Sequence, residues 1–370
     1  MRWDAQRLDL AEPEVLPGLP TVRGLLRSVE VPEFPGLTFH EVRAKSALNA
    51  VPAGSAMPFA YTVNTFRGCS HACVYCYARS THEWLELDSG TDFDQQIVVK
   101  TNVVEVLRRE LARPSWKREH VALGTNTDPY QRAEGRYRLM PGVIDALARS
   151  GTPFSVLTKG TLARRDVPRL AAASRDVPIG MGVSMAIWDD DLHAALEPGV
   201  PTPRARLDLV RAITDAGLPC GVFLAPVLPG LTDRLEHLEA AIGAIAAAGA
   251  TGVTVVPLHL RPGAREWFTA WLAREHPGLV GRYRQLYGRG AYVPAEYRAW
   301  LAGRVAPLLA RHGLDRQSSG TARGTAGEPA GPDTGLPGDE SVGFPAGSLP
   351  VRPVGHVPVV PPEPEQLALC

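Results

Sequence analysis

The sequence predicts an α/β fold, an incomplete (β/α)6 barrel, because buried strands and amphipathic helices alternate along its middle. Six apolar, strand-like runs lie between residues 59 and 257, with five helix-like segments between them. Continuous apolar strands of this kind form buried parallel sheets with helical crossovers. A doubly wound open sheet has the same periodicity. Polar residues directly after successive strands favour the barrel, because a barrel assembles its site at those strand ends.

The predicted elements follow one another as strand, loop and helix. The strand-like runs cover residues 59–66, 120–124, 154–158, 179–185, 221–225 and 252–257. The helix-like segments cover residues 103–112, 141–149, 167–173, 203–216 and 235–248. Thr202 is the predicted N-cap of the fourth of these helices, and Pro203 occupies its first position.

Composition divides the chain into four segments. Residues 1–55 alternate short apolar clusters with Pro and Gly, which predicts an extended N-terminal arm lying on the core. Residues 56–262 contain the predicted barrel. Residues 263–316 are rich in aromatic residues at helical spacing, and we expect a C-terminal helical extension that closes the barrel. Residues 317–370 combine Gly, Pro, Ser and acids with few apolar residues, which predicts a disordered tail.

The overall charge excludes a protein that binds polyanions through net charge alone, because 39 basic residues balance 39 acidic ones. Residues 257–316 carry ten Arg against four acids; this leaves open either a nucleic-acid face or ordinary solvated helix surfaces. No apolar run reaches the roughly 20 residues of a membrane helix. The first residues also lack a signal-peptide core. We therefore expect a cytoplasmic protein that does not enter a membrane.

Three cysteines within eight residues form the most informative motif. Cys69, Cys73 and Cys76 have the spacing C-x3-C-x2-C. Three thiolates on one short loop can hold three corners of a [4Fe–4S] cluster, and the fourth iron is then left open to a small molecule. Structural zinc requires four ligands, and His71, between two of the cysteines, could reach the same ion only with strain. We predict the cluster, with structural zinc or a chance grouping of buried thiols as the alternatives.

This loop resembles the cluster loop of the radical S-adenosylmethionine (SAM) enzymes, including Tyr75 just before the third cysteine. Residues 64–79 resemble more narrowly the branch related to spore photoproduct lyase, and so do residues 124–131, 157–160 and 225–230. The resemblance implies a [4Fe–4S] cluster that, once reduced, cleaves SAM to a 5′-deoxyadenosyl radical for hydrogen abstraction. It also implies a reduced flavodoxin- or ferredoxin-like electron donor.

The resemblance assigns further residues to SAM. Thr125, Asn126, Thr127 and Asp128 follow the second predicted strand, where the superfamily usually has a Gly-Gly-Glu motif that receives the SAM amino group. An ordinary Asx or Ser/Thr turn is the alternative there. By the same resemblance, Lys159 pairs with the SAM carboxylate and Ser184 binds the ribose or the carboxylate. The remaining candidates lie near the start of the fourth helix and are Glu197 and Arg206.

One absence separates this chain from spore photoproduct lyase. That enzyme uses a further cysteine after its cluster loop to return a hydrogen atom, whereas this chain has no cysteine between Cys76 and Cys220. The substrate therefore stays unassigned, with nucleic acid as the candidate class, in DNA repair or RNA modification. The alternatives are a non-catalytic iron–sulfur protein for electron transfer or redox sensing, and a zinc-stabilised nucleic-acid-binding protein. A redox sensor does not require polar residues at four successive strand ends.

Overall fold

Six parallel strands form the open barrel that the sequence predicts. The computed structural model describes residues 24–52, 55, 57–318 and 343–350. Among them, the main sheet has the strand order β11-β10-β9-β8-β7-β4-β3. Neighbours from β4 to β11 pair in parallel, and β3 is antiparallel at the edge. The strands are β3 (Leu48–Ala50), β4 (Tyr61–Val63), β7 (Val121–Leu123), β8 (Phe154–Thr158), β9 (Ile179–Ser184), β10 (Cys220–Val227) and β11 (Gly252–Pro257).

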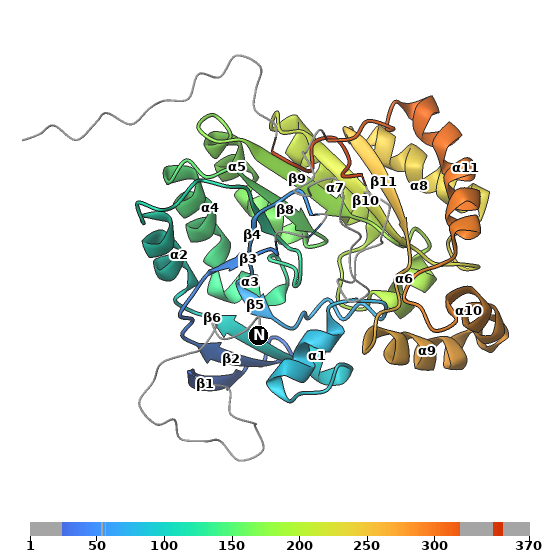
Figure 1. Cartoon of the computed structure of the whole chain (residues 1–370), viewed down its shortest axis with the longest axis horizontal. Helices are drawn as coiled ribbons and strands as arrows, with labels where there is room; N and C mark the ends of the chain where they lie inside the picture. Colours follow the sequence, from blue (N-terminus) through green and yellow to red (C-terminus); the bar gives the residue numbers. More distant parts are fainter. Residues whose placement is uncertain (1–23, 53–54, 56, 319–342, 351–370) are drawn as a thin grey trace, which may run out of the picture.

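Amphipathic helices connect these strands and cover the sheet. Helices α2, α4 and α5 lie on one side of the view, and α8 on the other (Figure 1). Each buries an apolar face; α4, for example, buries Met140, Val143 and Leu147. The predicted N-cap is confirmed, because Thr202 Oγ1 accepts a hydrogen bond from Ala205 N at 3.3 Å. The connecting helices are α2 (Val103–Leu111), α3 (Arg132–Tyr137), α4 (Leu139–Arg149), α5 (Val167–Ala173), α6 (Asp190–Leu196), α7 (Pro203–Asp215) and α8 (Leu235–Ala247).

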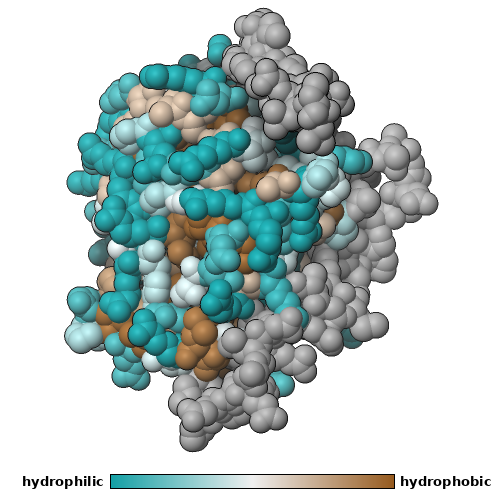
Figure 2. All heavy atoms as spheres, turned by 90° about the vertical axis from the view of Figure 1, so that its left-hand side faces the viewer, coloured by the Kyte–Doolittle hydropathy of each residue, from teal (hydrophilic) through white to brown (hydrophobic). Residues whose placement is uncertain are grey.

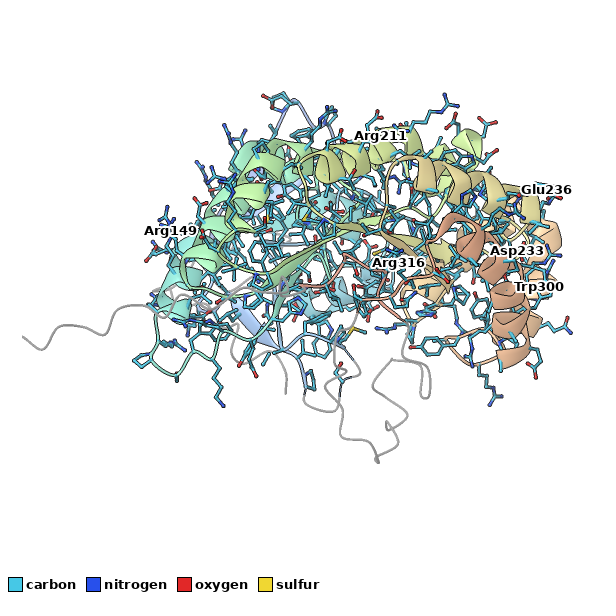
Figure 3. All side chains as sticks on the ribbon, turned by 90° about the horizontal axis from the view of Figure 1, so that it is seen from above. Arg149, Arg211, Asp233, Glu236, Trp300 and Arg316 are labelled. Atoms are coloured by element: carbon cyan, nitrogen blue, oxygen red, sulfur yellow. The ribbon has the colours of Figure 1, made fainter. Side chains whose placement is uncertain are left out.

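The polar faces of these helices point into solvent. Arg149 on α4, Arg211 on α7 and Glu236 on α8 project outward from the helical layer (Figure 3). The side of the molecule that faces left in Figure 1 is largely hydrophilic and carries only scattered apolar patches (Figure 2). Among the described residues, none of the helices combines the length and the apolarity that crossing a bilayer requires.

A second, smaller sheet was not predicted, and its strands lie before and after β4 in the sequence. Its strand order is β1-β2-β6-β5, with β1 (Leu25–Glu30), β2 (Thr38–Val42), β5 (Phe66–Arg67) and β6 (Gln96–Lys100). The single strand expected over residues 59–66 is therefore two strands, because β4 pairs with β7 and β5 pairs with β6. Between β5 and β6 lie the cysteine loop, the 3-10 helix η2 (Arg79–Leu85) and α1 (Thr91–Gln95).

The aromatic residues after the barrel form core contacts. Phe268 packs against Trp271 and Tyr283 with ring centroids 5.6 and 5.5 Å apart. Trp300 differs, since it is 40% exposed and lies under Arg304. The elements here are α9 (Ala264–Glu275), α10 (Val280–Tyr287) and α11 (Ala295–His312), of which α11 packs on α8 and β11.

Residues 343–350 lie across the amino ends of β9, β10 and β11, and we call this segment the floor. Met181 N donates to the Gly347 carbonyl at 2.8 Å, and Leu349 is 4% exposed. Glycines at the strand starts leave the necessary room: a Cβ at Gly180 would lie 2.5 Å from the Ser348 carbonyl oxygen. The disorder expected over residues 317–370 does not hold for the floor, because the average composition of the segment hides one short apolar stretch. Residues 319–342 and 351–370 lie outside the described part of the chain.

The floor predicts a specific stability effect. Replacing Leu349 by Ala removes a buried side chain, so we expect the free energy of unfolding to fall by about 2–5 kcal/mol. The control is Leu162→Ala, because Leu162 is 38% exposed; surface changes typically cost within about 0.5 kcal/mol. Urea denaturation of both variants measures the difference. Equal effects at the two positions would show that the floor does not contribute to the core.

Candidate functional site

The cysteines lie on one loop, which continues from β5 and which we call the cluster loop (residues 68–79). Backbone turns fold it, since Ala72 N donates to the Cys69 carbonyl at 3.1 Å and Cys76 N donates to the Cys73 carbonyl at 3.1 Å. Gly68 begins the loop with φ +75°, and a Cβ there would lie 2.8 Å from the His82 ring. These turns direct all three cysteines into one cavity.

The connection between α6 and α7 supports one side of the cluster loop. Val74 N donates to the Leu196 carbonyl at 2.9 Å, and Gly199 N donates to the His71 carbonyl at 3.1 Å. A Cβ at Gly199 would lie 2.1 Å from the Ser70 carbonyl oxygen, so only glycine permits this approach. The loop is thus in direct backbone contact with a segment more than a hundred residues later.

The segment after β7 supports the other side through the side chains of Thr127 and Gln131. Thr127 was expected among the residues that receive SAM, whereas Gln131 was not singled out from the sequence. Gln131 accepts from Ser70 N at 2.9 Å and donates to the Gly68 carbonyl at 3.0 Å. Thr127 Oγ1 also donates to the Gly68 carbonyl, at 2.8 Å. Both residues belong to the motif at residues 124–131, so their place in that motif was the available signal. Their buried side chains join the end of β7 to the start of the cluster loop.

The cavity opens at the carboxyl ends of the barrel strands, as a barrel site should. Its volume is about 260 Å³, and its lining includes the three cysteines. Polar side chains from the strand ends and a set of apolar side chains line it together. The polar residues include Asn126, Asp128, Lys159 and Ser184, and the apolar ones include Leu157, Phe223, Val256 and Leu258.

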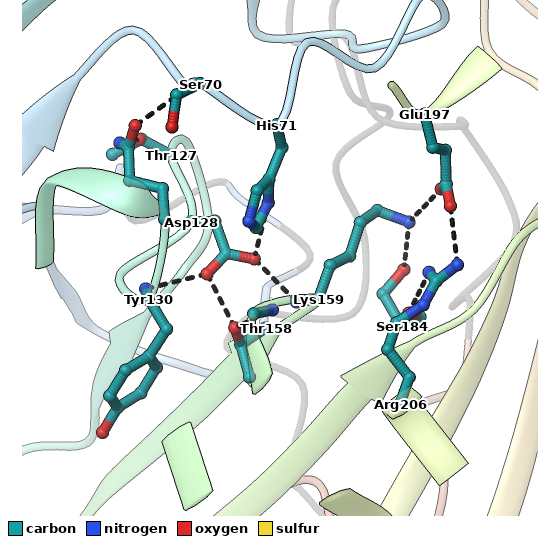
Figure 4. A network of polar contacts seen from close by, with 12 residues as sticks. Ser70, His71, Thr127, Asp128, Tyr130, Thr158, Lys159, Ser184, Glu197 and Arg206 are labelled. Atoms are coloured by element: carbon teal, nitrogen blue, oxygen red, sulfur yellow. Dashed lines mark hydrogen bonds and ion pairs between the residues drawn. The ribbon is translucent and has the colours of Figure 1, made fainter. Parts of the chain in front are cut away.

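Asp128 joins two strand ends to the cluster loop (Figure 4). Its carboxylate accepts hydrogen bonds from Thr158 Oγ1 at 2.6 Å, from Lys159 N at 2.6 Å and from Tyr130 N at 2.8 Å. His71 Nδ1 lies 3.4 Å away. Burial alone would raise the pKa of Asp128, but His71 and these hydrogen bonds hold that pKa below its ordinary value.

Glu197 is the centre of a second network (Figure 4). It accepts from Lys159 Nζ at 3.0 Å, from Arg206 Nη2 at 2.6 Å and from the Tyr75 hydroxyl. Lys159 Nζ also donates to Ser184 Oγ at 3.0 Å. Burial would raise the pKa of Glu197, but the two cations hold it well below its usual range. One carboxylate thus connects the cluster loop, two strand ends and α7.

The structure brings most of the predicted site residues together. Tyr75 and the strand-end residues line the cavity with the cysteines, whereas Glu197 and Arg206 lie behind it at 0% exposure. Thr125 does not line the cavity, and its carbonyl accepts a hydrogen bond from the Tyr77 hydroxyl. Cys220 begins β10, at the end of the barrel away from the cavity, and burial raises its pKa to about 12.

The three cysteines fit an iron–sulfur cluster. Cys69 and Cys73 are 7% exposed, and burial raises the pKa of Cys76 to about 11, with Arg79 opposing this. A bound cation is therefore what stabilises the thiolates that ligate metal. Within the described ranges, no three Cys, His, Asp or Glu side chains converge on one ion position. A cluster does not require such convergence, because each thiolate binds a different iron.

The Glu197 network predicts a large loss of stability when it is broken. Glu197→Gln leaves Lys159 and Arg206 without their buried anion, which should cost about 3–5 kcal/mol of unfolding free energy. The control, Glu239→Gln, breaks an exposed pair with Arg311 and should cost at most about 1 kcal/mol.

The same prediction has a pH dependence. Because the pKa of Glu197 is lower in the folded chain, its contribution is complete above the ordinary value of 4.5 and is lost as the pH falls. Denaturant melts at several pH values should therefore show the two variants converging in acid. A constant difference across the pH range would contradict this assignment.

Comparisons with known proteins agree with this geometry. The family model described as the radical SAM superfamily matches residues 63–242. Uncharacterized proteins of Mycobacterium tuberculosis and Mycobacterium bovis are 60% identical over 318 residues, which is 85% of this chain and 93% of theirs. An uncharacterized protein of Methanocaldococcus jannaschii is 24% identical over 193 residues, 52% of this chain and 69% of that protein.

Solved structures show the same fold. Spore photoproduct lyase complexed with dinucleoside spore photoproduct superposes with a TM-score of 0.57 at 13% identity, covering 74% of this chain and 79% of that one. A mutant of the same enzyme with bound SAM and dinucleoside spore photoproduct gives 0.53 at 13% identity, over 70% and 76%. The chain therefore belongs to the radical SAM superfamily of enzymes, and its partial barrel has the fold of spore photoproduct lyase.

Proposed function

We propose that the protein holds a [4Fe–4S] cluster on Cys69, Cys73 and Cys76 and binds SAM in the adjoining cavity. One observation carries this proposal: the three thiols and a row of strand-end polar side chains line the same cavity. When bound and reduced, the cluster with SAM supplies a 5′-deoxyadenosyl radical for hydrogen abstraction from a substrate. A flavodoxin- or ferredoxin-like protein would supply the electron.

Lys159 and Ser184 are suited to the carboxylate of SAM. Lys159 is 14% exposed at its side chain and lines the cavity. Glu197 carries one negative charge, whereas its partners Lys159 and Arg206 carry two positive charges together. These three side chains therefore have a net charge of one positive unit. A net positive wall attracts an anionic group, and charge-assisted hydrogen bonds from an ammonium are strong. Glu197 and Arg206 then act as positioning residues for Lys159.

The segment after β7 offers the acceptors for the SAM ammonium. Asp128 already accepts three hydrogen bonds from the chain, so its main task is to fix the strand ends. Asn126 lines the cavity beside it, and its carbonyl oxygen is the better acceptor. Thr125 contributes through its backbone carbonyl, which orients Tyr77.

The apolar wall excludes water from the reacting atoms. Phe223 and Leu258 are 9% and 1% exposed, and both line the cavity together with the polar side chains. Such a wall protects a reactive radical from side reactions. A non-catalytic electron-transfer or redox-sensing protein, the alternative, has no use for this combination of a polar row and an apolar wall.

Nucleic acid is the substrate class that we propose. The spore photoproduct lyase structures contain a dinucleoside substrate. Here, Tyr77 at the cavity is 46% exposed, and Arg261 lies 5.4 Å from its ring centroid. His259, which lines the cavity, packs edge-on against Tyr292 at 4.6 Å. Aromatic rings with adjacent arginines are surfaces on which bases stack.

The cluster assignment predicts a clean division among the cysteines. Replacing Cys69, Cys73 or Cys76 by Ala should abolish the cluster or leave it labile, because each removes one of three iron ligands. Cys220→Ala should keep about four irons and four sulfides per chain. Iron and sulfide analysis after anaerobic reconstitution measures this. A requirement for Cys220 would contradict the three-ligand assignment.

The SAM assignment predicts the effect of removing one ammonium. Lys159→Met keeps the aliphatic stem but loses a charge-assisted bond worth roughly 1.5–3 kcal/mol, so SAM binding should weaken by about one to two orders of magnitude. Lys117→Ala, at an exposed lysine, is the control. SAM titration of the reduced cluster by electron paramagnetic resonance gives the affinities, and chromatography gives the yield of 5′-deoxyadenosine. Unchanged affinity and yield in Lys159→Met would remove Lys159 from the SAM site.

A further inference from the structure

Arg79 is a fully buried cation that has no place in the SAM site. It follows the third cysteine by three residues, does not line the cavity, and is 0% exposed. A buried charge is costly unless it is paired and hydrogen-bonded. The contacts of its guanidinium therefore indicate what it stabilises.

The guanidinium holds the middle of the cluster loop. Its Nε and Nη2 both donate to the Cys73 carbonyl, at 3.2 and 2.9 Å. Its Nη2 also donates to both carboxylate oxygens of Asp94, at 2.9 and 3.0 Å. Its Nη1 donates to the Gly90 and Ser89 carbonyls, at 2.8 and 3.2 Å. One planar group thus ties the backbone of a cysteine to the segment that enters α1.

Two aromatic rings pack against the same guanidinium. Phe93 and Trp267 have centroids 5.3 and 5.0 Å from its central carbon. The Trp267 ring lies directly over Gly90, where a Cβ would be 2.4 Å from a ring atom. Because Trp267 belongs to α9, Arg79 connects the cluster loop to a helix that follows the barrel.

Lysine could not replace these contacts. An ammonium has three donors on a point charge, whereas the guanidinium presents five donors in a fixed planar fork and stacks on rings. Without Arg79, the Cys73 carbonyl loses two donors and Asp94 keeps a largely buried carboxylate without its partner. Both losses act on the loop whose shape places the three sulfurs.

We propose that Arg79 is a positioning residue that holds the cluster loop in the shape that binds the iron–sulfur cluster. The proposal rests on the cluster assigned above. Arg79 contacts the backbone of a ligand and not the cluster itself, so it acts by orienting Cys73. Its supports are Asp94 and Gly90 on one side and Trp267 on the other.

The test compares Arg79→Lys with a change at a partly buried, carboxylate-paired arginine elsewhere, Arg165, whose side chain is 25% exposed. Arg165→Lys is the control, because Arg165 also donates two bonds to a carboxylate, that of Asp166, and pairs with Glu134. After anaerobic reconstitution, iron per chain and the rate of cluster loss to excess chelator are measured for each. The thermal midpoint of the unloaded chain reports general stability, and the electron paramagnetic resonance spectrum of the reduced cluster reports its environment.

Arg79→Lys should lose its cluster roughly tenfold faster than wild type or more, because loss of a group that orients a metal ligand typically weakens metal binding by about 10–100-fold. Its electron paramagnetic resonance spectrum should also change. Arg165→Lys should lose the cluster at the wild-type rate even when its thermal midpoint falls equally. A wild-type rate in Arg79→Lys overturns the proposal. If Arg79→Lys does not fold, Trp267→Leu decides, since this residue reaches the cluster loop through Arg79: faster loss supports the proposal, and unchanged loss overturns it.

The same experiment separates this inference from the proposed function. A wild-type chain that assembles no iron–sulfur cluster would contradict the function. A wild-type chain that assembles one, with variants that retain it equally long, would contradict only the role of Arg79.

Discussion

The site depends on one buried carboxylate. Glu197 binds Lys159, Arg206 and the hydroxyl of Tyr75, so it joins the end of β8, helix α7 and the cluster loop. The attraction of the two cations offsets the desolvation penalty of burying this carboxylate, and the carboxylate in turn fixes where the two cations lie. The position of the lysine ammonium beside the cysteines is therefore a consequence of this group.

An incomplete barrel has exposed ends and edges, and additional segments compensate for them. The floor crosses the amino ends of three strands, and its Phe344 packs edge-on against Phe223 at 5.7 Å. Phe223 also lines the cavity, so a segment at the opposite end of the barrel supports the wall of the site. On the outer side, Arg79 and Trp267 support the cluster loop. Two segments that follow the barrel in the sequence, the floor and helix α9, thus support the site.

The sequence predicted the repeating strand and helix pattern and the cysteine motif. The six barrel strands, their helices and the cysteine loop could be predicted because apolar periodicity and thiol spacing are local signals. The small sheet could not, because β2 pairs with β6, whose sequence lies more than fifty residues later. Asp128 was found as a polar strand-end residue, but only the fold shows that the chain already satisfies its carboxylate. Arg79 is the last residue of the motif at residues 64–79. Its partners Asp94 and Trp267 could not be predicted from a local sequence pattern, because they lie outside that motif and meet Arg79 only in the fold.

In the proposed site, three cysteines bind three irons and leave the fourth iron open to SAM. Mössbauer spectroscopy tests this arrangement on the chain reconstituted with the Mössbauer-active iron isotope, with and without SAM. We expect one iron of four to change its isomer shift when SAM is added, and Cys220→Ala to behave identically. Four irons that ignore SAM, or a fourth protein ligand at that iron, would contradict it.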